Sequence, residues 1–441
     1  MGSAMNWWQE ALVEHPEIAV FLVLAVGFWC GKFTFKGLGL GSVTATLVAG
    51  VIIGAVVSVH LEDGSTARVV VSHGAIEMFF LAFLFALGFR LGPQFFAGLR
   101  GAGAPQALFA VTVIAVGIMT SILISAALGY NPGLAAGLTA GGLTQSSIVG
   151  ISQDAIGGLP ENSDTLDEWN NLVLVGFAVT YIFGTLGSAI YCANVAPRLL
   201  GIQDLKAAAK ATEAQLGLGD EQFDDATADH SVEHPAFAPP EVMVPATGEE
   251  SGQSGEQERS STATDFITVG LGTAAGALLG IPSVTVGNLP LALTPSVGAL
   301  LLGLLIGWWR ARSASPDRNP AGVQWFFETV GLTVFVAMIG INAGPGFVDG
   351  MRDFGVGLLF AGALVTLAPL IAGTLLARYV FKFDAVVSLG MLAGAQTMSA
   401  AAGSVQEAAD SNVPLLGYTV PYAVGNVFLS IGGAIVVAVL A

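Results

Sequence analysis

Long runs of hydrophobic residues, separated by shorter polar segments, dominate this chain from end to end. A helix of about 20 predominantly apolar residues is long enough to cross the hydrocarbon core of a bilayer. On this basis we predict ten membrane spans, at residues 17–31, 42–59, 75–91, 104–128, 170–194, 265–281, 290–309, 322–342, 355–377 and 414–440. The pattern therefore predicts an all-α polytopic membrane protein.

Two further apolar segments, at residues 133–156 and 386–409, are weaker than the ten spans. Both are rich in Gly, Ala, Thr and Ser, and both end in a glutamine followed by an acidic residue. Glycine is a poor helix former, and hydroxyl side chains compete for backbone hydrogen bonds. We predict that these segments are re-entrant or broken helices. The alternative is that each one crosses the membrane completely.

The basic residues favour one orientation in the membrane. If the N-terminus lies outside and both weak segments return to their own side, 13 of the 15 Lys and Arg residues face the cytoplasm, where such residues normally gather. The two exceptions are Arg68 and Arg352. We therefore predict a protein of the cell (inner) membrane with both termini outside. Complete crossing by the weak segments would place six spans in each half and move many basic residues outside.

A polar stretch divides the membrane segments into two halves. It holds 13 acidic and three basic residues, the pair Pro239-Pro240 and few apolar residues, a composition that cannot build a core. We predict a disordered cytoplasmic linker at residues 203–263, between a first membrane repeat at residues 17–202 and a second at residues 264–441. Residues 1–16 are predicted to hold a tag remnant and an extracellular N-terminus.

The two halves repeat each other in sequence. The run from Gly88 to Pro93 recurs as the run from Gly340 to Pro345, and Thr-x-Ser and Gln-acid pairs recur in the two weak segments at an offset of 253 residues. Small residues recur in any membrane helix, which explains the glycines but not the polar residues in register. Because each half holds an odd number of spans, the second copy is predicted to be inverted. Inverted repeats with broken helices are typical of secondary transporters, including elevator-like ones.

Composition excludes several classes of function. Hydrophobic residues make up 54 % of the 441 residues and charged residues only 11 %, against roughly 25 % charged in an ordinary soluble domain. The mean hydropathy is +0.73, and the net charge of −17 leaves no basic surface for nucleic acid. Soluble enzymes and nucleic-acid binders are therefore excluded.

No cofactor or metal site is expected. Cys30 and Cys192 lie inside apolar runs and are interpreted as packing residues. His230 and His234, in the acidic linker, form only a weak candidate metal site. No nucleophile-base order, P-loop or dinucleotide fingerprint occurs in its required context, so the chain is not expected to be an enzyme.

The breaks in the weak segments are the strongest candidate binding site. Free backbone groups at half-helix ends can hold ions and polar substrates. A single serine would be explained by hydrogen bonding to its own helix, but two matched motifs favour a polar pocket. The candidate residues in and beside the two breaks are Thr144, Gln145, Ser146, Ser147, Gln396, Thr397 and Ser399.

Residues in neighbouring spans complete the candidate site. Arg90 lies near the end of an apolar span, where it either snorkels to the headgroups or clamps a substrate carboxylate. Its counterpart in the second half is the neutral Asn342. Tyr181, Tyr422 and Asn426 lie inside spans and either line the pocket or simply pack.

The acidic residues give no support for a carboxylate at the centre of a span. Glu77 and Glu328 open two matched spans. We interpret them as helix-start acids near an interface, favoured by the helix dipole, rather than as proton-coupling groups. This placement argues against a proton antiporter built on a midplane carboxylate.

The duplicated motifs resemble those of a known transporter family. The Gly-x-x-x-Gly-Pro-x-Phe motif occurs at Gly88 and Gly340, and the Ala-Gly-x-x-Thr-x-Ser motif at Ala140 and Ala393. Together with the polar central loop they resemble the aspartate:alanine exchanger family, which includes dicarboxylate and succinate exporters. The resemblance covers roughly residues 17–200 and 265–440. It implies exchange or export of small anionic amino acids or dicarboxylates, and two inverted repeats with matching tip motifs.

This sequence departs from that family in two respects. Many members carry folded regulatory domains in the central loop, which the short linker here cannot hold. Many also have proline after the threonine of the tip motif, where this chain has Ser146 and Ser399. The first departure bears on regulation and the second on the substrate.

The leading hypothesis is a secondary transporter of a small carboxylate that works by alternating access. The alternative is a sodium-coupled symporter of glutamate-like anions, followed by a passive anion channel. The expected partners are a small carboxylate or amino-acid substrate and the lipid bilayer, with a coupling cation left open. We also expect a homodimer, with Gly50/Gly54 and Gly303/Gly307 providing close helix contacts within the scaffold or the dimer.

Overall fold

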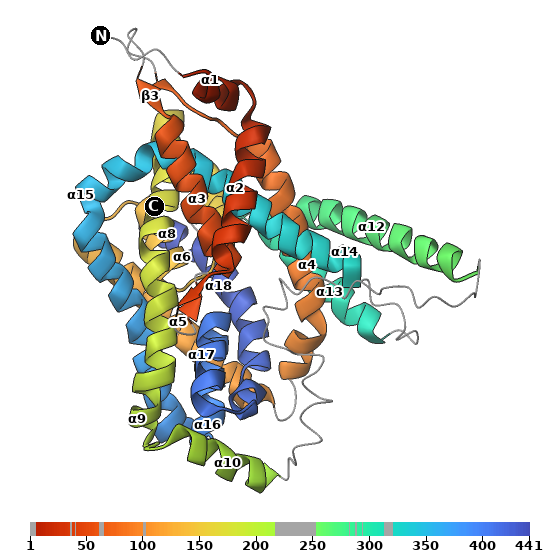
Figure 1. Ribbon diagram of the computed structural model, residues 1–441, viewed down its shortest axis with the longest axis vertical. Helices are drawn as coiled ribbons and strands as arrows, with labels where there is room; N and C mark the ends of the chain where they lie inside the picture. The colour runs from red at the N-terminus through yellow and green to blue at the C-terminus, as the bar shows by residue number, and fades with distance from the viewer. Residues whose placement is uncertain are drawn as a thin grey trace.

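The computed structural model is a bundle of helices with three short β-hairpins (Figure 1). It describes residues 6–35, 38–39, 41–60, 66–99, 103–216, 253–281, 283–286, 289–292, 294–312 and 321–441. The predicted tag remnant and most of the predicted linker, including its two histidines, lie outside these residues. Most buried apolar side chains of the described residues belong to one continuous core, and two smaller clusters contain others.

The first half contributes helices from α1 to α10 in chain order. Their bounds are α1 Trp7–Glu14, α2 Pro16–Gly31, α3 Gly41–Val57, α4 His73–Gly98, α5 Ala104–Leu128, α6 Pro132–Gly142, α7 Ser147–Gly157, α8 Ser163–Ile190, the π-helical turn η2 Tyr191–Val195, α9 Ala196–Leu200 and α10 Leu205–Leu216. Two hairpins interrupt them: β1 Thr34–Phe35 with β2 Leu38–Gly39, and β3 Val59–His60 with β4 Thr66–Ala67.

The second half follows a similar order. Its elements are α12 Gln253–Gly280, the hairpin β5 Ser283–Val286 with β6 Leu289–Ala292, α13 Pro295–Arg312, α14 Ala321–Trp325, the π-helical turn η3 Phe326–Val330, α15 Gly331–Leu375, the π-helical turn η4 Leu376–Phe381, α16 Ala385–Ala395, α17 Ser399–Ala409, the 3₁₀ turn η5 Val413–Gly417 and α18 Thr419–Leu440.

Fewer helices than predicted have the length and hydropathy of a membrane span. Six qualify among the described residues, and seven if the bent pair α1 and α2, at 103°, counts as one span. The predicted span at 290–309 is wrong at its start: residues 289–292 form strand β6, and helix α13 begins only at Pro295. Proline is well suited to the first turn of a helix, so it fixes this boundary.

Two predicted spans form one continuous helix. The sequence predicts residues 322–342 and 355–377 as separate spans, but α15 runs through both, with Pro345 and Pro369 inside it. Figure 1 shows α15 changing direction along its length, and its two limbs each satisfy the length and hydropathy of a span. A proline removes one backbone hydrogen bond and bends a helix without always ending it.

Both weak segments are broken helices. The first divides into α6 and α7, and the second into α16 and α17, each helix being eleven residues long. The breaks contain Thr144 and Thr397, and each residue has a positive φ of 56°. This left-handed conformation is uncommon for a residue other than glycine, and β-branched residues adopt it at a cost. The same strained conformation thus occurs at both matched positions.

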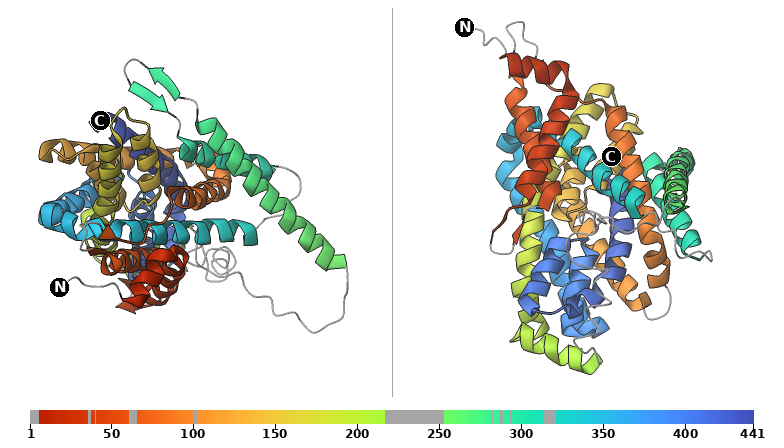
Figure 2. Two further views of the ribbon diagram at one scale, coloured as in Figure 1. Left: turned by 90° about the horizontal axis from the view of Figure 1, so that it is seen from above. Right: turned by 45° about the vertical axis from the view of Figure 1, so that its right-hand side comes forward.

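The prediction of disorder at residues 203–263 is wrong at both ends, because residues 205–216 form α10 and residues 253–263 belong to α12. Helix α10 lies across one end of the bundle against α16 and α17 (Figure 1). Its composition, rich in Ala, Leu, Lys and Glu, favours a helix, and the Asp204 side chain accepts a hydrogen bond from Ala207 N at 3.1 Å. The ribbon of α12, which follows in the chain, extends away from the rest of the bundle (Figure 2).

The two halves are interlocked by glycine contacts. Helix α3 of the first half packs on α15 of the second, and α13 of the second half packs on α4 of the first. A methyl group on Gly54 would overlap the carbonyl oxygen of Ile341, and one on Gly307 would overlap that of Phe89. These backbones approach each other so closely that only glycine fits. The glycines predicted to mediate scaffold or dimer contacts therefore make contacts within the chain.

Candidate functional site

The two helix breaks contact each other directly. Thr144 Oγ1 donates a hydrogen bond to the carbonyl oxygen of Gln396 at 3.1 Å. In return, Thr397 Oγ1 lies 3.2 Å from Gln145 Oε1 and 2.7 Å from the carbonyl oxygen of Gln396. Residues 252 positions apart in the sequence thus form reciprocal contacts. We call this pair of breaks, residues 143–146 and 396–398, the tip pair.

Helix α18 joins the tip pair from one side. Gln145 Nε2 lies 3.2 Å from Ser430 Oγ and 3.4 Å from both the carbonyl oxygen and Oδ1 of Asn426. Ser147 Oγ is 2.5 Å from Ser430 Oγ. Asn426 in turn donates from Nδ2 to the carbonyl oxygen of Tyr422 at 2.9 Å. Buried amides and hydroxyls need such partners, so this network orders the first break.

Gln396 anchors the second break to other helices. Its Oε1 accepts a hydrogen bond from Ser188 Oγ of α8 at 3.0 Å, and its Nε2 donates to the carbonyl oxygen of Thr366 of α15 at 3.1 Å. Gln396 as a whole residue is 2 % exposed. Both ends of this amide are therefore paired with the surrounding protein, and the two hydrogen bonds connect the second break to α8 and α15.

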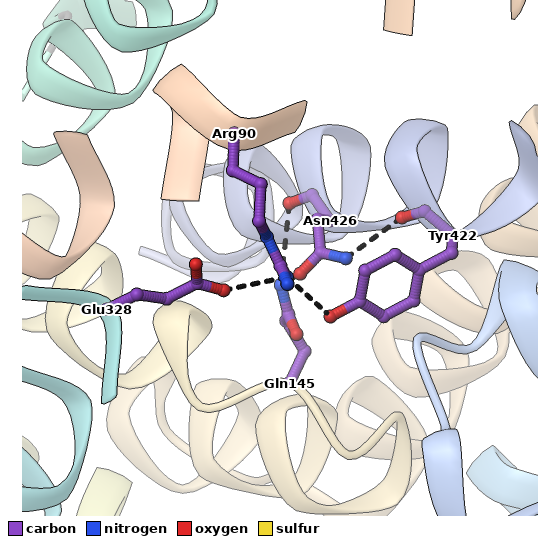
Figure 3. Close-up of polar contacts among 5 residues, drawn as sticks. All are labelled: Arg90, Gln145, Glu328, Tyr422 and Asn426. Carbon is purple, nitrogen blue, oxygen red and sulfur yellow. Dashed lines mark hydrogen bonds and ion pairs between the residues drawn. The ribbon is translucent and has the colours of Figure 1, made fainter. Parts of the chain in front are cut away.

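Arg90 lies beside this network and forms a buried ion pair. Its Nη2 is 2.7 Å from Glu328 Oε1 and 3.5 Å from the hydroxyl of Tyr422 (Figure 3). The Arg90 side chain is 20 % exposed and that of Glu328 is 6 % exposed. An arginine that reached out to lipid headgroups would be largely exposed. Arg90 therefore faces the protein interior rather than the headgroups, and its interpretation as a clamp for a substrate carboxylate stays a prediction.

The guanidinium of Arg90 is not fully used by these contacts. Its Nε is buried and has no hydrogen-bond partner among the described residues. A guanidinium carries five donors in a planar fork that matches the two oxygens of a carboxylate. Arg90 therefore combines a buried positive charge with spare donor capacity, next to the helix that binds the tip pair.

Glu328, the ion-pair partner of Arg90, is not among the candidate site residues that the sequence pattern identifies. Its position at the start of a predicted span favours a helix-start acid near an interface, but the structure buries it in the π-helical turn η3. A signal is nevertheless present, since Glu328 follows the aromatic run Trp325-Phe326-Phe327. An ionisable residue among apolar neighbours in a membrane segment is by default a functional candidate with a partner to be found.

Asn342 lies elsewhere, despite its position in the repeat. Its Nδ2 donates to the carbonyl oxygen of Val71, and its Oδ1 accepts from Val71 N, both at 3.0 Å. The side chain thus pairs with the extended segment that precedes α4. This two-point contact occupies both ends of the amide and explains why a polar residue is kept inside α15.

The remaining sequence candidates are only partly joined to the network. Tyr181 is half-buried, and its ring packs against Phe177 with centroids 4.9 Å apart. Ser146 is half-buried at the start of α7, and Ser399 is half-buried at the start of α17. The structure therefore brings together the tip pair, Ser147, Arg90, and Tyr422 and Asn426 of α18 from the predicted site. No group of three or more potential metal-ligating side chains occurs within the described ranges.

The chain is similar in sequence to known membrane transporters. Residues 19–197 and 268–438 match the aspartate–alanine exchanger family described as a predicted permease membrane region. An uncharacterized transporter of Shewanella oneidensis is 31 % identical over 573 aligned positions, which cover 99 % of this chain and 100 % of the relative. An aspartate/alanine antiporter of Tetragenococcus halophilus is 24 % identical, with 99 % of this chain and 100 % of the relative covered.

A third relative agrees with these two. An uncharacterized transporter of Bradyrhizobium diazoefficiens is 28 % identical, over 89 % of this chain and 100 % of the relative. These relatives are named as transporters or antiporters, and none of the three is named as an enzyme. The alignment with the Shewanella protein runs over 573 positions, so that relative carries more than a hundred residues that this 441-residue chain lacks.

Proposed function

The chain belongs to the aspartate–alanine exchanger family of membrane permeases, and we propose that it exchanges or exports small anionic amino acids or dicarboxylates. The family makes it a multi-pass membrane transporter. The finer proposal, a small carboxylate as substrate, rests on one observation: a largely buried arginine, whose buried Nε has no partner among the described residues, lies beside the helix that binds the tip pair. A guanidinium is the side chain best suited to a carboxylate.

The tip pair supplies the polar groups that a bound substrate needs besides a countercharge. Thr144, Gln145 and Thr397 present hydroxyl and amide groups where two half-helices end. Such groups can bind the amino or second carboxylate group of a substrate without a permanent buried charge. The proposed site therefore consists of Arg90, Tyr422, Asn426 and the tip pair, with Gln396 holding the second break in position.

The proposed mechanism is alternating access by two inverted repeats. Matched strained residues at both breaks and reciprocal contacts between them support a duplicated, pseudo-symmetric site. In this proposal the helices that carry the breaks, α6, α7, α16 and α17, move against a scaffold that contains the interlocked pairs α3 with α15 and α4 with α13. An elevator-like movement, a homodimer, and an inner-membrane location with both termini outside are parts of the same proposal.

The experiment is counterflow in proteoliposomes. Vesicles loaded with unlabelled aspartate, alanine, succinate or glutamate receive labelled substrate, with and without a sodium gradient. Exchange predicts uptake that requires internal substrate and ignores sodium. Uptake into empty vesicles driven by sodium would support the symporter instead, and uptake of none of these carboxylates would contradict the proposed substrate class.

Replacing Arg90 tests the site within the same experiment. Arg90→Ala removes the charged donor of the proposed site, so we expect counterflow to fall by roughly thirtyfold or more, the factor that corresponds to about 2 kcal/mol for a lost buried charge contact. The matched control is Arg352→Ala, because Arg352 of α15 is itself exposed. Full counterflow by Arg90→Ala, with the control also active, would remove Arg90 from the site.

A further inference from the structure

Glu328 has a place in the site that the transport proposal does not use. It lies in η3, the π-helical turn between α14 and α15, and packs against α4. Its carboxylate is 2.7 Å from Arg90 Nη2, and its side chain is 6 % exposed. A buried carboxylate needs a compensating charge, and Arg90 is the partner that the described residues provide.

Arg90 stands between two different parts of the molecule. On one side Nη2 meets Glu328 of η3, and on the other it meets the hydroxyl of Tyr422 of α18 (Figure 3). Tyr422 belongs to the same helix as Asn426, and Asn426 contacts Gln145 of the first break. The guanidinium is thus the point where the η3 carboxylate and the tip network come together.

The guanidinium of Arg90 has a donor that a second carboxylate could use. Nη2 serves both Glu328 and Tyr422, while the buried Nε has no partner among the described residues. A free carboxylate gains most from a guanidinium when both of its oxygens are bound. A substrate that offers such a two-point contact would compete with Glu328 for the same cation.

We propose that Glu328 is the resident carboxylate of Arg90, and that the carboxylate of the transported anion displaces it. This inference rests on the proposed function, because it presupposes a carboxylate substrate. Two carboxylates beside one buried guanidinium repel each other, so binding of one weakens the hold on the other. Glu328 keeps the charge of Arg90 compensated when the site holds no substrate, and it lowers the affinity for the substrate by competition.

The role of Glu328 follows from this competition. It does not bind substrate itself and acts through Arg90, so it is a positioning residue that tunes affinity and release. Because the departing substrate is replaced at Arg90 by Glu328, release does not leave an uncompensated buried cation. Removal of the Glu328 charge should therefore make substrate bind more tightly and leave more slowly.

The test is carboxylate binding to the purified full-length protein, followed by counterflow. Glu328→Gln keeps the size of the side chain and removes its charge. Binding of L-aspartate and of succinate is measured by isothermal titration for the wild type, Glu328→Gln, Glu328→Asp and the control Glu77→Gln. Glu77 is the acid of the first half that corresponds to Glu328. It is half-buried in the first turns of α4.

Competition predicts that Glu328→Gln lowers the Kd by roughly tenfold, a size typical of coupling between two binding events. The maximal counterflow rate should fall at the same time, because release becomes slower. Glu328→Asp retains the charge on a shorter side chain and should give an intermediate Kd, while Glu77→Gln should match the wild type. A merely structural role for Glu328 would instead weaken binding.

The outcomes separate the two proposals. A wild-type protein that binds neither aspartate nor succinate contradicts the proposed function, and the inference with it. A wild type that binds, together with a Glu328→Gln variant whose affinity is unchanged or weaker, overturns the inference alone. If Glu328→Gln does not fold, Glu328→Asp decides: an affinity no higher than that of the wild type overturns the inference.

Discussion

At the scale of single residues, two residues at corresponding positions of the repeat have different contacts. Arg90 and Asn342 occupy corresponding places in the two halves, yet Arg90 pairs with Glu328 and Asn342 pairs with the backbone of Val71. The repeat therefore preserves a polar position without preserving its chemistry. One copy supplies a charge to the candidate site, and the other secures a neighbouring segment.

The contact between Asn342 and Val71 leads to a prediction about stability. Asn342→Ala leaves the N–H and carbonyl groups of Val71 without their partner, and an unpaired buried polar group costs about 1–3 kcal/mol. We expect a lower unfolding temperature, measured by thermal denaturation in detergent, and an unchanged Kd for L-aspartate.

Asn342→Asp provides the matched comparison for this prediction. It keeps the acceptor for Val71 N, loses the donor to the carbonyl oxygen of Val71, and adds a charge. It too should lower the unfolding temperature without weakening binding. A large loss of aspartate affinity in Asn342→Ala would return Asn342 to the substrate site, where its place in the repeat had suggested it.

At the scale of elements, glycine spacing determines which helices meet. On α4, Gly88 and Gly92 face α13, and on α13, Gly303 and Gly307 face α4. The backbones of the two helices therefore lie in direct contact. Between apolar helices in a bilayer there is little hydrophobic driving force, and close van der Waals packing takes its place. The glycine motifs thus bring α4 and α13 together within one chain, whereas the sequence alone is compatible with either scaffold or dimer contacts.

Replacing one of these glycines should separate the helices. A methyl group in Gly307→Ala meets the carbonyl oxygen of Phe89, and overpacking of this kind costs roughly 1–3 kcal/mol. We expect a lower yield of monodisperse protein in size-exclusion chromatography and a lower unfolding temperature. Gly270→Ala is the control, because a methyl group there meets nothing within 4 Å. Equal behaviour of the two variants would contradict the proposed close packing.

At the scale of the whole molecule, each half depends on the other. The second span of each half, α3 or α13, packs on a helix of the opposite half, and the two breaks complete each other through Thr144 and Thr397. Helix α10 adds a further link, because Thr212 Oγ1 donates to Asp384 Oδ2 of the second half at 3.3 Å. Neither half therefore contains all the contacts that its own helices need.

This interdependence can be tested by dividing the chain. Two fragments separated within residues 217–252, which lie between α10 and α12, should copurify and catalyse counterflow when expressed together. Each fragment expressed alone should aggregate or be degraded, because its glycine-lined helix faces remain uncovered. A single fragment that is monodisperse and resists proteolysis would show that the helix contacts between the two halves are not required for folding.

The sequence by itself determined the elements that depend on local composition. The apolar runs defined most of the long helices, and the glycine- and serine-rich weak segments marked both broken helices, because hydrophobicity and helix propensity act over neighbouring residues. The same reasoning failed where proline or strand pairing intervened, as at residues 289–292 and within α15. It also missed α10, because the acidic, proline-containing residues that follow this helix dominate the composition of the stretch as a whole.

Only the tertiary structure decided which polar groups meet. Sequence placed Thr144, Gln145 and Thr397 at matched breaks, but their reciprocal hydrogen bonds join residues more than 250 positions apart. The pairing of Arg90 with Glu328 could not be read from spacing, because it depends on how α4 packs against η3. A buried charge is stable only with its partner, and that partner is chosen by the packing of helices rather than by order along the chain.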